Sequence, residues 1–143
     1  MNRVTDILHA TTVCVSGAGV MIIGPSGSGK SSLALQLLGL GAGLVADDRT
    51  QVLRDGDQII ASVPNPIAGQ IEARGVGIIE VVDSGPTPLA LVVDLGQTET
   101  MRLPEIHMHD VLGIPMACLH KTVSVHFPSA ILLYMKSGLR AAL

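Results

Sequence analysis

The chain has 143 residues, 48% of them hydrophobic and 15% charged, and a formal net charge of −3. This is the size of one domain, and a chain so rich in apolar side chains can bury enough surface to exclude intrinsic disorder. The longest apolar stretch, residues 13–23, contains serine and glycine and falls short of the roughly 18 residues that a membrane span needs. The acidic balance and the 1% aromatic content exclude the basic, stacking surfaces typical of nucleic-acid binding.

The first third of the chain predicts strands around one helix. Residues 11–23 predict two short strands joined by a tight turn, and the apolar run that ends the second is typical of a strand buried on both faces. A glycine-rich loop then leads to leucines at helical spacing, which predict a helix that begins near Lys30 and ends at Gly39. A further strand is expected over residues 43–46.

The middle of the chain predicts mostly strands and loops. The alternation in residues 50–63 predicts a hairpin around an Asp-Gly turn. The prolines and glycines that follow predict loop as far as Gly75. Strands are expected over residues 77–82 and 89–95, and the second is apolar enough to be central in a sheet.

The last third has fewer signals. Residues 96–110 are polar, and no element is expected there. A short strand is expected over residues 123–125, and a closing helix over residues 130–143 with Ser129 as its N-cap. The whole pattern predicts a single α/β domain over residues 1–143, with a mixed sheet and few helices.

Residues 24–31 fit the phosphate-loop pattern G-x-x-x-x-G-K-[ST] at every position. Glycines allow backbone N–H groups to turn inward around an anion, and the following helix directs the positive end of its dipole to the same place. Lys30 is expected to reach the β- and γ-phosphates of a nucleotide, and the Ser31 hydroxyl to hold Mg²⁺. The residues expected to bind nucleotide are Gly24, Pro25, Ser26, Gly27, Ser28, Gly29, Lys30 and Ser31.

Two aspartates, Asp47 and Asp48, follow the strand expected over residues 43–46. If that strand lies parallel and adjacent to the strand before the phosphate loop, both carboxylates reach the loop at the carboxyl edge of the sheet. Neighbouring residues of a strand point to opposite faces, so one carboxylate would face a metal or cation and the other an acceptor. The alternative is that both are solvated turn residues.

Weaker signals come from other polar residues. Glu72 and Arg74 lie in a glycine-containing stretch that can approach a phosphate, and a plain turn explains them equally well. His9 precedes the first strand pair, and a lone histidine is more often structural. His107 and His109 hint at a metal, but no further ligands with zinc spacing accompany them, so both are expected to be surface or loop residues.

The two cysteines, Cys14 and Cys118, are too few for a disulfide framework. Their apolar surroundings predict buried core thiols, which suit a reducing compartment and a cytoplasmic protein.

These pieces together resemble the catalytic domain of the HPr kinase/phosphorylase family. The resemblance is strong over residues 9–82 and thin beyond them. It is carried by His9, residues 17–38, the segment LVADD (residues 44–48), the segment IEARGVGIIEV (residues 71–81) and, more faintly, Arg102 in MRLPE. The implied fold is a P-loop α/β kinase core similar to that of phosphoenolpyruvate carboxykinase, usually assembled as a hexamer.

The resemblance also implies a function and a set of roles. The function is ATP- and Mg²⁺-dependent phosphorylation of a serine on an HPr-type phosphocarrier protein of the phosphotransferase system, and its reversal by phosphorolysis. The implied catalytic residues are Asp48 as general base, His9 as its partner, Lys30 on the transferred phosphoryl group, and Arg102. Ser31 and Glu72 would hold Mg²⁺ with Asp47 in support, and Arg74 would contact phosphate.

Three departures from the family pattern shape the expectation. The chain matches only the catalytic domain, Ser32 stands where the family commonly has Glu, and residues 123–129 lack the arginines of the family's C-terminal segment. That segment is linked to dephosphorylation, so a kinase with weak or no phosphorylase activity is expected. A small-molecule P-loop kinase and a non-catalytic ATP-binding sensor or scaffold remain as alternatives.

Overall fold

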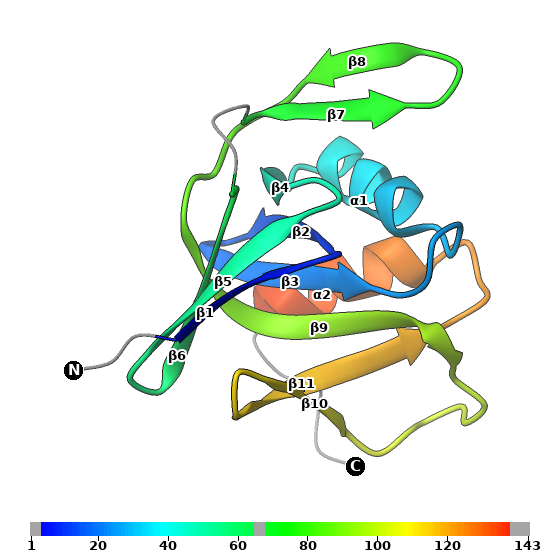
Figure 1. The fold of residues 1–143 in the computed structure, drawn as a ribbon. Coiled ribbons are helices and arrows are strands. Elements are labelled where there is room, and N and C mark those ends of the chain that lie inside the picture. The colour runs from blue at the N-terminus through cyan, green and yellow to red at the C-terminus, as the bar shows by residue number, and fades with distance from the viewer. Residues whose placement is uncertain (1–3, 65–67, 138–143) are drawn as a thin grey trace.

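The computed structural model describes residues 4–64 and 68–137 as a layered α/β structure (Figure 1). The elements are β1 (Val4–Leu8), β2 (Thr11–Val15), β3 (Ala18–Ile23), α1 (Lys30–Gly39), β4 (Gly43–Ala46), β5 (Thr50–Asp55), β6 (Gln58–Ser62), β7 (Gln70–Ala73), β8 (Gly77–Glu80), β9 (Thr87–Thr98), β10 (His107–Val111), β11 (Ile114–Lys121) and α2 (Phe127–Ser137). Neither helix of the described residues is long and apolar enough to cross a membrane.

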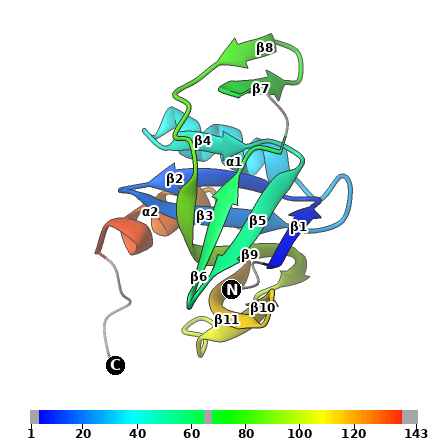
Figure 2. The ribbon, with the colours of Figure 1, turned by 60° about the vertical axis from the view of Figure 1, so that its left-hand side comes forward.

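The long strand β9 organises the main sheet, whose order is β1-β5-β6-β9-β3-β2-β4. The start of β9, at Thr87 and Pro88, pairs with β6, whereas its later part pairs with β11. The sheet therefore divides along β9, with β1, β5 and β6 in one branch and β10 and β11 in the other. The β7–β8 hairpin forms a separate two-stranded sheet beyond α1, away from β10 and β11 in both views (Figures 1 and 2).

Two hydrophobic cores lie on opposite faces of the central strands. Val20 and Ile22 of β3 belong to the first core with residues of α1 and α2, whereas Met21 belongs to the second core with residues of β5, β6, β10 and β11. On β9, Leu91 belongs to the first core and Val92 to the second. Because both faces of β3 and β9 are covered, their sequences are continuously apolar rather than alternating.

Most strands expected in the first part of the chain are present. The strand pair β2–β3, the helix α1, the hairpin β5–β6 and the central strand β9 confirm the sequence analysis. The adjacency expected for β4 is wrong, because β4 pairs with β2, and β2 separates it from β3. Both ladders of β2 are antiparallel, so β4 still runs in the same direction as β3.

Four expectations about later elements are wrong. Residues 70–73 form β7 rather than loop, because Ile71 and Ala73 are buried. Residues 123–125 form no strand, and Val125 is 98% exposed. The helix α2 begins at Phe127, so Ser129 lies inside it, and residues 138–143 of the expected helix fall outside the described residues. The strands β10 and β11 were not expected at all.

The sequences of β10 and β11 do not show the alternation of apolar and polar residues that predicts a strand. In β10 the inward positions carry histidines, and β11 contains Pro115, which argues against a strand in a sequence. His107 and His109 therefore lie half-buried on β10 rather than in a loop. Cys118 is buried as expected, but Cys14 is only half-buried, and both thiols are free.

Candidate active site

Three strand termini meet at one edge of the sheet. The strands β3 and β4 end there, and β2, which runs the opposite way between them, begins there. This arrangement places the phosphate loop after Ile23, the two aspartates after Ala46, and the His9–Thr11 segment side by side. The antiparallel strand between β3 and β4 thus adds a third segment to the site, instead of separating the loop from the carboxylates.

The phosphate loop is closed around its own lysine. Lys30 is 7% exposed, and its Nζ donates hydrogen bonds to the backbone oxygens of Gly24 at 2.8 Å and Pro25 at 3.1 Å. Gly27 and Gly29 have φ angles of 80° and 102°, a left-handed conformation that side chains disfavour. The loop therefore depends on glycine for its shape.

The loop fits a bound phosphate in two further respects. Within the described residues, the Ser28 hydroxyl is buried and lacks a hydrogen-bond partner. A Cβ atom at Gly24 would come within 2.7 Å of that hydroxyl, so the interior of the loop has no room for another side chain. Phosphate oxygens are strong acceptors and would satisfy this hydroxyl.

The carboxylate of Asp47 faces the phosphate-loop serine. Its Oδ1 accepts hydrogen bonds from the Ser31 hydroxyl at 3.0 Å and from the Thr11 hydroxyl at 3.2 Å. A serine hydroxyl beside a carboxylate is an oxygen set that suits Mg²⁺, which is held by few protein oxygens together with phosphates and waters. Thr11, fully buried at the start of β2, was not singled out from sequence.

Asp48 has different partners from Asp47. Its Oδ1 lies 2.7 Å from Nε2 of His9, and the two side chains are 67% and 55% exposed. Its backbone N–H donates to the Thr11 hydroxyl at 3.1 Å, and its φ angle is 67°. The two aspartates therefore face different partners. Both lie beyond the end of β4, where Asp48 has a left-handed backbone, so the alternation of a strand, on which the sequence analysis relied, does not apply to them. We call His9 and Asp48 the cleft pair.

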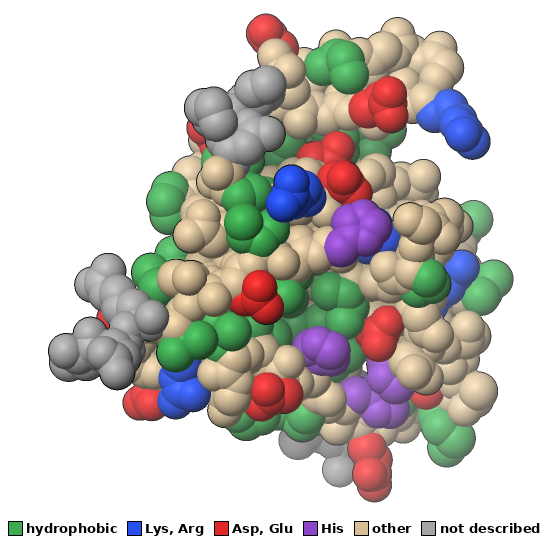
Figure 3. Space-filling view, viewed as in Figure 1, with side chains coloured by type: hydrophobic (Ala, Val, Ile, Leu, Met, Phe, Trp, Pro, Cys, Tyr) green, Lys and Arg blue, Asp and Glu red, His purple; other side chains and the backbone are tan. Residues whose placement is uncertain are grey.

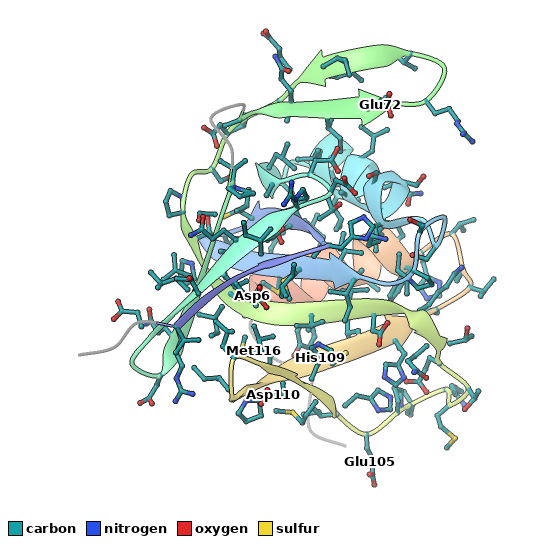
Figure 4. All side chains as sticks on the ribbon, in the orientation of Figure 1. Asp6, Glu72, Glu105, His109, Asp110 and Met116 are labelled. Atoms are coloured by element: carbon teal, nitrogen blue, oxygen red, sulfur yellow. The ribbon has the colours of Figure 1, made fainter. Side chains whose placement is uncertain are left out.

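A cleft of about 680 Å³ joins these groups to the β7–β8 hairpin. Most predicted site residues line it, namely His9, Ser26, Gly27, Gly29, Lys30, Ser31, Asp47, Asp48, Glu72 and Arg74. Figure 4 labels Glu72 on β7, which packs against α1. Figure 3 shows acidic, basic and histidine side chains gathered on this face of the molecule.

A second hollow of about 430 Å³ adjoins the cleft. Asp47, Asp48 and Glu72 line both spaces, while Ile7 and Ile78 give the second hollow an apolar margin. The exposed Arg102 lies between β9 and β10 and lines neither space. The structure therefore brings the predicted residues together except for Arg102.

A strand, a phosphate loop and a helix, with carboxylates at the same sheet edge, define a P-loop kinase-type fold. A family model described as "HPr Serine kinase C-terminal domain" matches residues 3–100. The chain belongs to this family.

Similar proteins agree with this assignment. "HPr kinase/phosphorylase 1" of Oceanobacillus iheyensis is 35% identical over 131 residues, covering 86% of this chain and 40% of the relative. "HPr kinase/phosphorylase" of Aromatoleum aromaticum is 40% identical over 126 residues, covering 76% of this chain and 39% of the relative. The chain thus spans about two-fifths of the length of these relatives.

A solved structure shares the fold. The "Hpr(Ser) kinase/phosphatase from Coxiella burnetii" superposes with a TM-score of 0.75 at 24% identity, covering 93% of this chain and 95% of that chain.

Proposed function

We propose that this chain is a kinase domain that transfers a phosphoryl group from ATP to a serine of an HPr-type phosphocarrier protein. The observation that carries the proposal is the position of Asp48. Its exposed carboxylate is held by His9 at 2.7 Å and borders both the phosphate-loop cleft and the adjoining hollow. A carboxylate between a donor site and an acceptor site can accept the proton of an attacking hydroxyl.

The residues of the loop would hold the nucleotide and its metal. Backbone N–H groups and the Ser28 hydroxyl would bind phosphate oxygens. The Lys30 ammonium would exchange its hydrogen bonds to the Gly24 and Pro25 oxygens for hydrogen bonds to phosphate. Ser31 and Asp47 would hold Mg²⁺ together with Glu72 from across the cleft. Mg²⁺ would supply neutralisation of the charge on the phosphates. Arg74, which lines the same cleft, would contact phosphate.

The second hollow supports a protein acceptor. It is open on one side of Asp48, and the exposed isoleucines Ile7 and Ile78 on its margin offer apolar surface to a partner. His9 would orient the Asp48 carboxylate and stabilise the proton that it receives. These features favour an acceptor that presents a serine on its surface over a metabolite enclosed by the site.

We further propose that phosphorolysis is weaker than the kinase reaction. Phosphorolysis needs a site for inorganic phosphate, which cations provide. Residues 121–124, Phe127 and Pro128 border a hollow against the phosphate loop, and the cation among them is Lys121. Residues 123–129 lack both arginines of the resembling family segment, and the exposed Val123 and Val125 offer no charge to a phosphate.

The direct test is transfer of label from ATP and Mg²⁺ to a purified HPr-type carrier, beside a carrier whose target serine is replaced by alanine. Label on the first carrier alone supports the proposal. No label on either, with ATP still bound, contradicts it and favours a metabolite kinase or a sensor. The phosphorolysis proposal fails if phosphoserine carrier and inorganic phosphate release pyrophosphate at a rate that equals the kinase rate.

The family resemblance also leads us to propose one kinase domain over residues 1–143 that forms a homo-oligomer, a hexamer, in the cytoplasm. Light scattering coupled to size-exclusion chromatography measures the assembly directly. A monomer at micromolar concentration contradicts this part of the proposal without affecting the kinase activity assigned to the cleft.

A further inference from the structure

A second group of chemically active side chains lies away from the cleft, on the branch formed by β9, β10 and β11. It consists of Glu99, His107 and His120, which we call the histidine cluster. One ligand atom from each residue lies within 4.8 Å of the others. Figure 3 shows a further group of histidine side chains on this lower part of the face.

The register of the strands brings the two histidines together. His107 pairs with Cys118 across the β10–β11 ladder, and His120 is two residues further along β11 on the same face. Side chains in such diagonal positions are within reach of one another. The two rings are stacked, with centroids 3.8 Å apart and planes inclined by 5°.

A β-bulge brings the carboxylate to the rings. The register shifts between His120 and Lys121, so that Lys121 lies opposite Thr98. The backbone N–H of Glu99 then donates to the Lys121 oxygen at 2.8 Å. Bulges often occur where a strand redirects a functional side chain.

The carboxylate is held in place from behind. Its Oε2 accepts hydrogen bonds from the backbone N–H groups of Thr100 at 3.0 Å and Met101 at 3.1 Å. Its Oε1 lies 2.7 Å from Nε2 of His107. The Glu99 side chain is 11% exposed and that of His107 is 34% exposed. One oxygen is therefore anchored, and the other is directed toward the rings.

From this geometry we propose that Glu99, His107 and His120 form a binding site for a divalent transition-metal ion of the Zn²⁺ type. Two imidazole nitrogens and one carboxylate oxygen are a preferred three-ligand set for this ion, with a fourth position left to water. Hydrogen bonds that anchor a ligating carboxylate are the usual support of such sites. The site is independent of the Mg²⁺ proposed in the cleft, which prefers oxygen ligands.

Ligation requires a small rearrangement. Around a tetrahedral Zn²⁺, the ligand atoms lie roughly 3.4 Å apart, given bonds of about 2.1 Å. One ring of the stack must tilt so that both nitrogens converge, and the partly exposed His107 has room to do so. The ion takes the place of the hydrogen in the 2.7 Å contact between Nε2 of His107 and Oε1 of Glu99, and the ring proton of His107 is then carried by Nδ1. Because ligating imidazoles and carboxylates must be unprotonated, acidic pH weakens binding.

The test is a calorimetric titration of the chelator-treated chain with Zn²⁺ in the presence of excess Mg²⁺. We expect one equivalent to bind, and Co²⁺ to give the visible absorption of a four-coordinate site. His120→Gln and Glu99→Gln should each weaken binding at least tenfold. His109→Gln and Glu105→Gln are the matched controls, because both residues, labelled in Figure 4, lie in β10 or the preceding segment but outside the cluster.

A second test uses the unaltered chain, so its result does not depend on whether the variants fold. Zn²⁺ should shift the imidazole nitrogen resonances of two of the five histidines, His107 and His120. The proposal is overturned if the unaltered chain binds no Zn²⁺ at micromolar concentration. It is equally overturned if Zn²⁺ perturbs other histidines instead, or if the control variants lose as much affinity as the cluster variants.

Discussion

Two histidine–carboxylate pairs in this molecule have the same separation but different surroundings. The His9–Asp48 and His107–Glu99 contacts both measure 2.7 Å. The side chains of the cleft pair are 55% and 67% exposed, whereas those of His107 and Glu99 are 34% and 11% exposed. The contact alone therefore does not tell the two sites apart.

The difference lies in what else each carboxylate touches. Asp48 has no second side-chain partner among the hydrogen bonds of the described residues, and it borders two open spaces. Glu99 receives two backbone N–H groups, and the His107 hydrogen bond together with these donors holds the pKa of its carboxyl below the ordinary value of 4.5. An accessible carboxylate suits proton transfer, and an anchored one suits ligation. The surroundings, rather than the pair, decide the chemistry.

The largest expected effect comes from removing the charge of the cleft carboxylate. Asp48→Asn should lower phosphoryl transfer to the carrier by about 10²–10⁴-fold, the usual contribution of a general base, and leave ATP affinity nearly unchanged. Asparagine tolerates the left-handed φ of 67° at this position, so the backbone should persist. Steady-state kinetics and nucleotide binding measure the two quantities separately.

The control for this substitution is Asp57→Asn, on the exposed β5–β6 turn. It should leave both quantities unchanged. An equal loss of ATP affinity and of transfer in Asp48→Asn would mean that Asp48 holds the nucleotide or its metal, and the contrast between the two carboxylates would lose its catalytic meaning.

A core substitution on β9 should disturb both regions at once, because β9 lies beside the phosphate loop and leads to Glu99. Leu91 is fully buried in the core that α1 and α2 cover. Leu91→Ala should lower the free energy of unfolding by about 2–5 kcal/mol through lost burial and a residual cavity. Urea denaturation measures it, with the exposed Val125→Ala as a control expected within about 0.5 kcal/mol of the unaltered chain.

The burial beneath the histidine cluster can be measured through Cys118, which pairs with His107 in the ladder. Burial raises the pKa of its thiol from 9.0 to about 11, which lowers the thiolate fraction at neutral pH by about 100-fold. In a Cys14→Ala background, alkylation of the folded chain should be slower than that of the urea-unfolded chain by at least this factor. Equal rates would show that this branch is open to solvent.

The smallest expected effect concerns acid stability. Because the pKa of Glu99 is lower in the folded chain, the ionised carboxylate stabilises the fold above pH 4.5, and this contribution is lost as the pH falls below that value through the folded pKa. The free energy of unfolding should therefore fall more steeply below pH 4.5 in the unaltered chain than in Glu99→Gln. Glu105→Gln, on the same segment, should keep the steep decline. A Glu99→Gln profile parallel to that of the unaltered chain would contradict the assignment.

The elements around the phosphate loop were predictable from sequence because their signals are local. The glycine pattern, the apolar run before it and the leucine spacing after it each lie within one element, and β3 and α1 follow them. Asp47 and Asp48 were identified from their place after an apolar strand, whereas His9 was identified only through the family resemblance. All three line the cleft. Thr11 was missed, because a threonine at the start of a strand is an ordinary β-former until its neighbours are known.

Other features depend on contacts between distant segments. Residues 70–73 were predicted as loop, because a segment with only two buried side chains is too short to show the alternation of a strand. The strand β7 forms because it pairs with β8 and packs against α1. The histidine cluster escaped detection because Glu99 and His120 lie on either side of His107 at spacings without a zinc pattern. Only the β9–β11 bulge and the β10–β11 register bring the three groups within reach.

Short-range backbone preferences and hydrophobic periodicity are sufficient to predict the phosphate loop, its flanking strand and helix, and the acidic residues beside it. The tertiary structure alone decided that β2 separates β3 from β4, that Thr11 joins the two aspartates, and that a carboxylate and two histidines meet on β9–β11. The reason is that strand order and register are set by non-local pairing and by burial on both faces of a sheet, which no local window of sequence contains.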